Sequence, residues 1–248
     1  MLETVIVVPC FNEAERLPRN PVLRFAQEHP EIHLLLVNDG SSDGTLALLQ
    51  DIAAASTGNI SVEDQQPNQG KAEAVRTGVL AAYAMSPRFI GYWDADLATP
   101  LEEIPRFIAV LEERPKVEIV FGSRVKLLGR SIERRAVRHI MGRVFATVAS
   151  LTLGLPVYDT QCGAKLFRAT PAMGRLFAEP WITGWIFDVE WIARLIETRR
   201  INDQPPAQEV IYELPLRTWH DVAGSKLKPR DFLRAIFEMA AIRRRYFR

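Results

Sequence analysis

The sequence predicts an α/β protein with a doubly wound, mainly parallel sheet. Short β-branched apolar runs alternate with segments of helical spacing in the first half of the chain, which is the pattern of consecutive βαβ units. Polar residues follow directly after several of these runs. The length of 248 residues, with 48% hydrophobic and 25% charged residues, is that of one ordinary globular domain.

In the first half we expect five strands and three helices. Residues 4–9 (T-V-I-V-V-P) form a short run that ends at a proline, as is typical of a buried parallel strand. The other expected strands are residues 32–37, 59–63, 88–93 and 117–121. The expected helices are residues 44–55, with Ser42 or Asp43 as the N-cap, 71–85 and 101–113.

The second half is less regular. We expect a long helix over residues 131–153 and a loop that enters a strand over residues 159–168. These are followed by a helix at residues 186–198, a strand at 209–217 and a basic amphipathic helix at 229–245. Because the chain has no internal repeat and no low-complexity linker, residues 1–248 are expected to form a single domain.

Polar side chains gather where this fold would place a binding site. In open α/β sheets, ligands bind beyond the carboxyl ends of the strands. The residues that follow the expected strands there are Asn12, Glu13, Asn38, Asp39, Asp94, Asp96, Ser123 and Arg124. We therefore expect the functional site at this edge of the sheet.

The residue types at this edge favour a divalent cation. The Gly70-Lys71 pair ends like a Walker A loop, but the first glycine and the Ser/Thr of that motif are missing, and no G-x-G-x-x-G follows the first strand. Asp94 and Asp96 could present oxygens to Mg²⁺ or Mn²⁺, which bridge to substrate phosphates. The alternative is that both aspartates only stabilise a turn. The four histidines have no zinc-binding spacing.

Charge, cysteines and hydropathy exclude other classes. With 31 basic and 30 acidic residues the net charge is +1, so the overall balance does not favour nucleic acid. Cys10 and Cys162 are too few for a disulfide scaffold and are expected to be packed, free thiols. The apolar run at residues 144–157 is too short to span a membrane, and no signal-peptide pattern occurs. We expect a cytoplasmic chain without a transmembrane helix.

Eight motifs resemble those of a known family. V-V-P-C-F-N-E (7–13), V-N-D-G-S-S-D-G-T (37–45), N-Q-G-K-A-E-A-V-R-T-G (68–78), D-A-D (94–96) and G-S-R (122–124) are similar to family 2 glycosyltransferases of the GT-A fold. In the second half, the motifs D-T-Q-C-G-A-K-L-F-R (159–168), F-D-V-E (187–190) and W-H-D-V-A-G-S-K (219–226) resemble the dolichyl-phosphate β-glucosyltransferases and related polyprenyl-phosphate glycosyltransferases.

The resemblance implies an inverting enzyme that moves a hexose from a nucleotide diphosphate sugar, with UDP-glucose expected, to a polyprenyl or dolichyl phosphate. Residues 1–125 would form the nucleotide-sugar half and residues 126–248 the acceptor and membrane-facing half. Asn38 departs from the Asp-Asp-Gly-Ser of the family, whereas Asp39 keeps the position associated with the base. Ala98 stands where related mannosyltransferases have a glutamine as a further metal ligand, which favours glucose. Mannosyl transfer from GDP-mannose is the alternative.

The resemblance also indicates roles on the donor side. Asp96 would contact the metal and Asp94 the metal or the ribose, so that the cation neutralises the leaving diphosphate. Asp39 could accept a hydrogen bond from the uracil imino N–H, and Lys71 could meet a phosphate at the start of its helix. The residues expected to line the base and ribose are Pro9, Phe11 and Glu13. The alternatives are an Asx turn for Asp39 and a solvated lysine for Lys71.

A phosphate acceptor changes the catalytic groups that are needed. A phosphate monoester has a second pKa of about 6, is mostly dianionic at pH 7 and needs no general base. Cationic side chains should instead position it, and the candidates are Arg124, Arg135, Arg138 and Lys226. Asp188 would orient the sugar or a clamping arginine.

Two basic segments favour contact with a membrane surface. Residues 126–143 contain six basic residues and one acidic residue, and residues 224–248 contain eight and two. Basic amphipathic helices lie in the headgroup plane of anionic membranes. We expect peripheral binding at the inner face of the membrane, and helices docked on the core are the alternative. Aromatic residues for base stacking are too sparse here to favour nucleic acid, and the sequence does not determine the oligomeric state.

Other functions stay open. A glycosyltransferase acting on a saccharide hydroxyl would use Asp188 or Glu190 as its base. A nucleotide-sugar sensor would bind the donor without transfer, although the intact D-A-D motif argues against it. A sugar-nucleotide pyrophosphorylase would need a glycine- and lysine-rich N-terminal loop that the chain lacks.

Overall fold

The computed structural model describes residues 2–132, 136–222 and 229–247, without the side chains of residues 136–141 and 229–233. Two of the expected acceptor residues, Arg135 and Lys226, lie outside the described residues. The side chain of Arg138 also lies outside the description.

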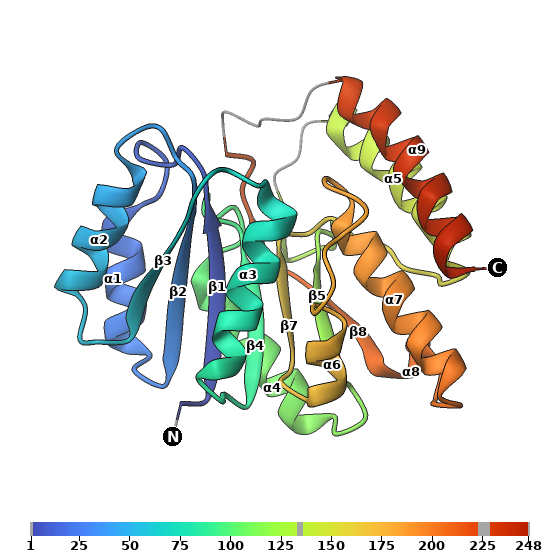
Figure 1. Cartoon of the computed structure of the whole chain (residues 1–248), viewed down its shortest axis with the longest axis horizontal. Coiled ribbons are helices and arrows are strands. Elements are labelled where there is room, and N and C mark those ends of the chain that lie inside the picture. Colours follow the sequence, from blue (N-terminus) through green and yellow to red (C-terminus); the bar gives the residue numbers. More distant parts are fainter. Residues whose placement is uncertain (1, 133–135, 223–228, 248) are drawn as a thin grey trace.

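A seven-stranded sheet forms the centre of the molecule, in the order β3-β2-β1-β4-β7-β5-β8 (Figure 1). Its strands are β1 (Thr4–Cys10), β2 (Ile32–Asp39), β3 (Ile60–Gln65), β4 (Phe89–Trp93), β5 (Ile119–Ser123), β7 (Ala164–Arg168) and β8 (Ile211–Pro215). β7 runs antiparallel to both of its neighbours, β4 and β5, whereas the other neighbouring strands are parallel. The predicted mainly parallel sheet is confirmed.

Helices cover both faces of this sheet (Figure 1). They are α1 (Arg19–Glu28), α2 (Thr45–Ala55), α3 (Lys71–Ala84), α4 (Ile104–Glu113), α5 (Ala136–Leu153), α6 (Pro171–Arg175), α7 (Phe187–Ile201), α8 (Ala207–Val210) and α9 (Pro229–Tyr246). Successive side chains of a strand point to opposite faces. Val5 and Val7 pack into one apolar cluster with α3, α5 and α7, and Ile6 and Val8 into another with α1, α2 and α4. The doubly wound architecture follows from these two cores.

Helix α1 is missing from the sequence prediction. It begins after Pro18 and contains Pro21 within its first turn, where a missing N–H removes no intrahelical hydrogen bond. The prolines obscure an apolar face that buries Val22 and Phe25. The short helix α6, which follows β7 directly, is also absent from the prediction.

Two predicted elements of the second half have different bounds. Residues 131–132 form strand β6 (Ser131–Ile132), because they pair with β9 (Thr218–Trp219), so α5 begins only at Ala136. The expected strand at 209–217 is shorter, since α8 occupies its beginning.

The expected N-cap of α2 is also wrong, because Gly44 takes that position. Asp43 instead accepts a hydrogen bond from the Thr45 amide in the first turn, at 3.0 Å. Cys10 and Cys162 are both buried thiols that form no disulfide, as expected.

Helices α5 and α9 contact each other and lie side by side at the outside of the molecule, above α7 in the view of Figure 1. Within the described part of the chain, no helix combines the length and the apolar character that crossing a membrane would require.

Candidate active site

The carboxyl ends of β1, β2, β4 and β5 lie at one edge of the sheet, because these strands share one direction. Asp94 and Asp96 follow β4, Arg124 follows β5, and Asp39 ends β2. Lys71 opens α3, directly after the loop that leaves β3. The edge therefore brings together the side chains that the sequence predicts there.

Asp94 is held by two neighbours from distant parts of the chain. Its amide donates a hydrogen bond to the Gly163 carbonyl at 2.9 Å, and its carboxylate occupies the space that a Cβ at Gly163 would fill. Lys71 Nζ lies 2.5 Å from Asp94 Oδ1. Desolvation opposes the charge on Lys71 only in part, since its side chain is 45% exposed, and the carboxylates of Asp94, Asp188 and Asp96 raise the pKa of the ammonium above its ordinary value.

Asp96 contacts a cation that the sequence analysis did not single out. Its Oδ2 lies 3.2 Å from Arg16 Nη2, and its Oδ1 accepts a hydrogen bond from the Ala98 amide at 3.1 Å. Burial and the nearby Asp94 carboxylate raise the pKa of Asp96, while Arg16 and Lys71 act in the opposite direction. Arg16 also lies 3.3 Å from the Glu13 carboxylate, so it connects two residues of the predicted site.

The two aspartates fit a divalent cation of the Mg²⁺ type. Among the described residues, no group of three or more His, Cys, Asp or Glu side chains could hold a metal ion by itself. Mg²⁺ is usually bound by one or two carboxylates, with water and substrate phosphates completing its shell. The Asp94 carboxylate repels that of Asp96 and contributes to the raised pKa of Asp96. A divalent cation bound between the two carboxylates would offset this repulsion.

Asp39 organises the loop between β3 and α3. Its Oδ1 accepts hydrogen bonds from the Gln65 side chain at 2.9 Å and the Gln69 amide at 2.8 Å. Its Oδ2 accepts from the Asn68 side chain and the Gly70 amide, both at 2.9 Å. An uracil N–H would therefore share a carboxylate that already accepts four hydrogen bonds.

The predicted base-lining residues lie on and after β1. Pro9 is part of that strand, and Phe11 and Glu13 follow it in a loop that is tied to the start of α2. The Glu13 amide donates to Thr45 Oγ1 at 2.8 Å. The Asn12 amide donates to Ser41 Oγ at 3.1 Å. This cross-linking fixes the loop that carries Glu13 and Arg16.

Arg124 is clamped by a carboxylate from the loop before β7. Its Nε and Nη2 lie 2.7 Å from the two oxygens of Asp159, and its amide also donates to Asp159. The guanidinium lies over the Trp219 ring, 5.5 Å from its centroid. Burial alone would lower the pKa of Arg124, but the paired Asp159 raises it. Arg124 is thus a permanently charged group with a fixed orientation.

Asp188 lies in the first turn of α7, where its carboxylate contacts residues of β4 and β7. The Tyr92 hydroxyl donates a hydrogen bond to it, and Lys165 Nζ lies 2.8 Å from the same oxygen. Burial raises the pKa of the Asp188 carboxyl, and Lys71 opposes that effect. Asp188 is buried, so its carboxylate faces protein partners.

Glu190, the other carboxylate of F-D-V-E, is a structural residue. Its side chain is 0% exposed and accepts hydrogen bonds from the Thr183 amide, the Arg194 guanidinium and the Tyr246 hydroxyl. It joins α7 to the preceding loop and to α9. The suggestion that Glu190 acts as a catalytic base is not supported by this environment.

Three residues of the site were not assigned a role from the sequence. Asp159 and Lys165 fall in the motif D-T-Q-C-G-A-K, which pointed to this segment but not to their contacts. Arg16 lies in no motif of its own, and its contact with Asp96 joins positions eighty residues apart. The candidates Arg135 and Lys226, with the Arg138 side chain, stay predictions because they fall outside the described residues.

A model of glycosyl transferase family 2 matches residues 5–173, a range that begins within β1 and ends within α6. The chain belongs to glycosyl transferase family 2. The family 2 chain is 31% identical over 242 residues to a dolichyl-phosphate β-glucosyltransferase of Drosophila melanogaster, covering 92% of this chain and 70% of the relative. It is 27% identical over 238 residues to a polyprenol monophosphomannose synthase of Mycolicibacterium smegmatis, covering 96% and 85%.

The fold of this family 2 enzyme is similar to that of solved structures of other proteins. The glucosyl-3-phosphoglycerate synthase of Mycobacterium tuberculosis, crystallised with Mn²⁺, UDP-glucose and phosphoglyceric acid, superimposes with a TM-score of 0.65 at 18% identity. The match covers 97% of this chain and 79% of that one. The predicted GT-A fold and the predicted class, a hexosyltransferase, are confirmed.

Proposed function

We propose that this family 2 enzyme transfers glucose from UDP-glucose to the phosphate of a polyprenyl lipid at a membrane surface, with inversion at the anomeric carbon and with Mg²⁺ or Mn²⁺. In this proposal residues 1–248 act as one domain. Residues 1–125 bind the nucleotide sugar, and residues 126–248 face the acceptor and the membrane. The names of the two curated relatives, which both concern lipid phosphates, support this acceptor class.

One observation carries the choice of a phosphate acceptor. The buried carboxylates of F-D-V-E are engaged by protein groups, since Asp188 contacts Tyr92 and Lys165 and Glu190 joins α7 to α9. A hydroxyl acceptor needs a general base, whereas a dianionic phosphate already carries its nucleophilic charge. The environment therefore favours an acceptor that needs cations for positioning rather than a base.

On the donor side, Asp94 and Asp96 would hold the divalent cation, which neutralises charge on the departing diphosphate when it is bound. Lys71, which lies 2.5 Å from Asp94, would contact the same diphosphate. Asp39, Pro9, Phe11 and Glu13 would lie around the base and ribose. Arg16 moves no proton in this scheme and adds a positive charge beside Asp96.

On the acceptor side, Arg124 would orient the lipid phosphate, and Arg135, Arg138 and Lys226 are further candidates for this role. A phosphate oxygen forms the new bond to the anomeric carbon while the bond from that carbon to the donor diphosphate breaks. The electron pair leaves with the nucleoside diphosphate. Because the acceptor is a dianion, no proton has to be removed from it.

Mannosyl transfer from GDP-mannose is the second candidate, supported by the relative from Mycolicibacterium smegmatis. The D-A-D motif argues for glucose, because it is followed two residues later by Ala98 rather than by a glutamine that could add a metal ligand. The Ala98 amide supports Asp96, but its methyl group offers no oxygen to a cation.

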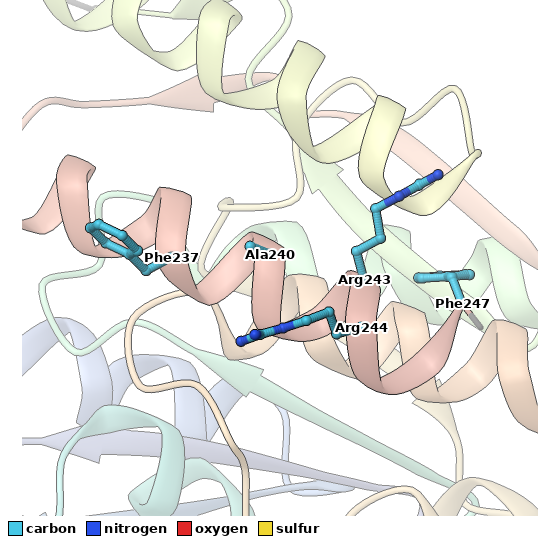
Figure 2. A pocket seen from close by; sticks show the side chains of 5 residues that line it. All are labelled: Phe237, Ala240, Arg243, Arg244 and Phe247. Atoms are coloured by element: carbon cyan, nitrogen blue, oxygen red, sulfur yellow. The ribbon is translucent and has the colours of Figure 1, made fainter.

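Helices α5 and α9 offer the surface on which the proposed membrane contact rests. Phe237 on α9 is 74% exposed and Leu151 on α5 is 73% exposed. A shallow groove of about 640 Å³ lies along α9, and Figure 2 shows the side chains that line it, with Arg243 reaching toward α5. The residues that line it are Phe237, Ala240, Arg243, Arg244 and Phe247. Exposed apolar groups beside arginines suit the interface of an anionic membrane.

Nucleotide release tests the proposal directly. UDP-glucose, UDP-galactose and GDP-mannose are each incubated with a short-chain polyprenyl phosphate, with Mg²⁺, Mn²⁺ or EDTA. The free polyprenol of the same length is the matched control, because it has a hydroxyl in place of the phosphate. We expect UDP release from UDP-glucose that requires the lipid phosphate and a divalent cation.

Each arm of this assay addresses one part of the proposal. Equal turnover with polyprenol would refute the phosphate acceptor, and turnover undiminished by EDTA would refute the metal. Preference for GDP-mannose would establish the second candidate. Donor binding without any transfer to either lipid would point to a different acceptor.

A further inference from the structure

Lys165 is a buried lysine near the start of β7, directly after the segment that contacts Arg124 and Asp94. Its side chain is 0% exposed, and its Nζ donates hydrogen bonds to the carbonyl oxygens of Thr160 at 3.0 Å and Cys162 at 2.7 Å. Asp188 Oδ1 lies 2.8 Å from the same nitrogen. Burial lowers the pKa of the Lys165 ammonium to about 7, and the three surrounding oxygens favour its charged form because they accept its three N–H groups.

The two carbonyl groups belong to the segment 159–163, and this segment supports both sides of the site. At its start, Asp159 clamps the Arg124 guanidinium with two contacts of 2.7 Å. At its end, Gly163 receives the Asp94 amide, and its missing side chain leaves room for the Asp94 carboxylate. A shift of this segment would therefore move Arg124 and Asp94 relative to each other.

The third partner, Asp188, connects Lys165 to α7. The Tyr92 hydroxyl donates to the same Asp188 oxygen, and Tyr92 lies opposite Lys165 on the neighbouring strand β4. The ammonium also lies 5.2 Å from the ring centroids of Tyr92 and Phe121. Lys165 is therefore enclosed by β4, β5, α7 and the segment 159–163.

We propose that Lys165 is a positioning residue of the transfer reaction, whose buried ammonium fixes the segment 159–163 against Asp188 and thereby sets the separation of Arg124 and Asp94. This role rests on the proposed function, because it assigns the acceptor phosphate to Arg124. Lys165 itself touches neither the donor nor the acceptor. Misplacement of reacting groups by about 1 Å can lower a rate roughly 100-fold.

A positioning role differs measurably from a stabilising one. Removing one member of a buried ion pair leaves an uncompensated charge and destabilises the fold, whereas removing both members can be close to neutral. The variants are Lys165→Met, Asp188→Asn and the double variant Lys165→Met/Asp188→Asn. The double variant removes the unpaired charge but does not restore the hydrogen bonds to the 159–163 carbonyl groups.

We expect the double variant to recover most of the Tm that Lys165→Met loses, while kcat per folded molecule stays roughly 100-fold below that of the wild type. The KM for the lipid phosphate should rise, and the affinity for UDP should change less than about threefold, since Asp39 and its loop are untouched. Hydrogen exchange of peptides covering residues 158–164 should be faster in both Lys165 variants.

Arg199→Met is the matched control. Arg199 is a buried cation at the other end of α7, with its Nη1 2.8 Å from Glu118 and its Nε hydrogen-bonded to the Pro205 carbonyl. This variant should lose Tm without losing kcat per folded molecule. If Lys165→Met and the double variant both fail to fold, Asp188→Asn serves as the test, with kcat expected to be about 10-fold lower.

A double variant with recovered Tm and a kcat within about threefold of the wild type would overturn the positioning role. So would a loss of kcat in Arg199→Met equal to that in Lys165→Met. Failure of the proposed function has a different signature, because the wild type itself would then show no turnover that depends on the lipid phosphate.

Discussion

The proposed donor side and the proposed acceptor side of the site are constructed differently. On the donor side, short loops after β1, β2 and β3 are cross-linked by hydrogen bonds, such as the four that Asp39 accepts. On the proposed acceptor side, α5 exposes Leu151, and α9 exposes Phe237 in a groove that Arg243 and Arg244 also line. The donor side is therefore fixed before any ligand arrives, and the acceptor side offers a surface suited to a large amphiphilic partner.

The largest expected effect comes from breaking the donor side at its carboxylates. Asp96→Asn should lower kcat by about 10³-fold, because a neutral amide holds a divalent cation less well and leaves the departing diphosphate without charge compensation. Titration with Mn²⁺ in the presence of UDP should show the weaker cation binding directly. The control is Asp51→Asn, which alters an exposed ion pair with Arg19. Unchanged Mn²⁺ binding in Asp96→Asn would contradict the assignment.

Gly163→Ala tests the junction of the two sides. An added Cβ would overlap the Asp94 carboxylate, so we expect kcat to fall by about 100-fold. Gly44→Ala is the control, because the nearest atom to its added Cβ is Ala14 Cβ at 3.8 Å, an ordinary contact. Full activity of Gly163→Ala would show that catalysis does not depend on the present position of Asp94.

Arg124→Gln separates the acceptor side from the donor side. Losing a charge-assisted contact of about 2 kcal/mol should raise the KM for the lipid phosphate about 30-fold, with UDP affinity unchanged. Steady-state kinetics with the acceptor varied provide the measurement. Arg88→Gln, which removes an exposed ion pair with Glu3, is the control. If UDP affinity fell instead, Arg124 would belong to the donor side.

The smallest expected effect concerns the surface of α9. Phe237→Ser should weaken binding to vesicles that contain anionic lipid by about 10-fold, because one large apolar side chain no longer enters the interface. Ile201→Ser on α7 is matched to it, since Ile201 is 70% exposed but lies outside the α9 groove. Flotation with anionic and neutral vesicles compares the two variants. Equal loss in both would exclude a specific α9 surface.

Much of the donor side could be predicted from sequence because it depends on local rules. Parallel strands end at one edge, so the residues after β2 and β4 converge there whatever the details of packing. This rule predicts the positions of Asp39, Asp94 and Asp96, whereas Lys71 is expected from its place at the start of a helix. The strand alternation likewise predicted the sheet and its two covered faces.

The contacts that the sequence did not reveal all join distant segments. β7 lies antiparallel between β4 and β5, and no local pattern of its five residues specifies those partners. The role of Lys165 follows from that placement. Arg16 contacts Asp96, which lies eighty positions away in the sequence, and Asp159 contacts Arg124, which lies thirty-five positions away. Helix α1 was not predicted for a local reason, because Pro18 and Pro21 are residues that usually indicate a loop.

The attachment of α9 determines how the enzyme could meet a lipid surface. The Tyr246 hydroxyl donates to Glu190 at 2.8 Å, and the Gly184 and Ile186 amides donate to Glu238. Lifting α9 from the body would break these hydrogen bonds to Glu190 and Glu238, each of which contributes about 1.5–3 kcal/mol because its acceptor is charged. α9 is therefore attached firmly to the body, so a bilayer that contacts α9 would set the tilt of the entire enzyme, including the edge of the sheet that carries Asp94, Asp96 and Arg124.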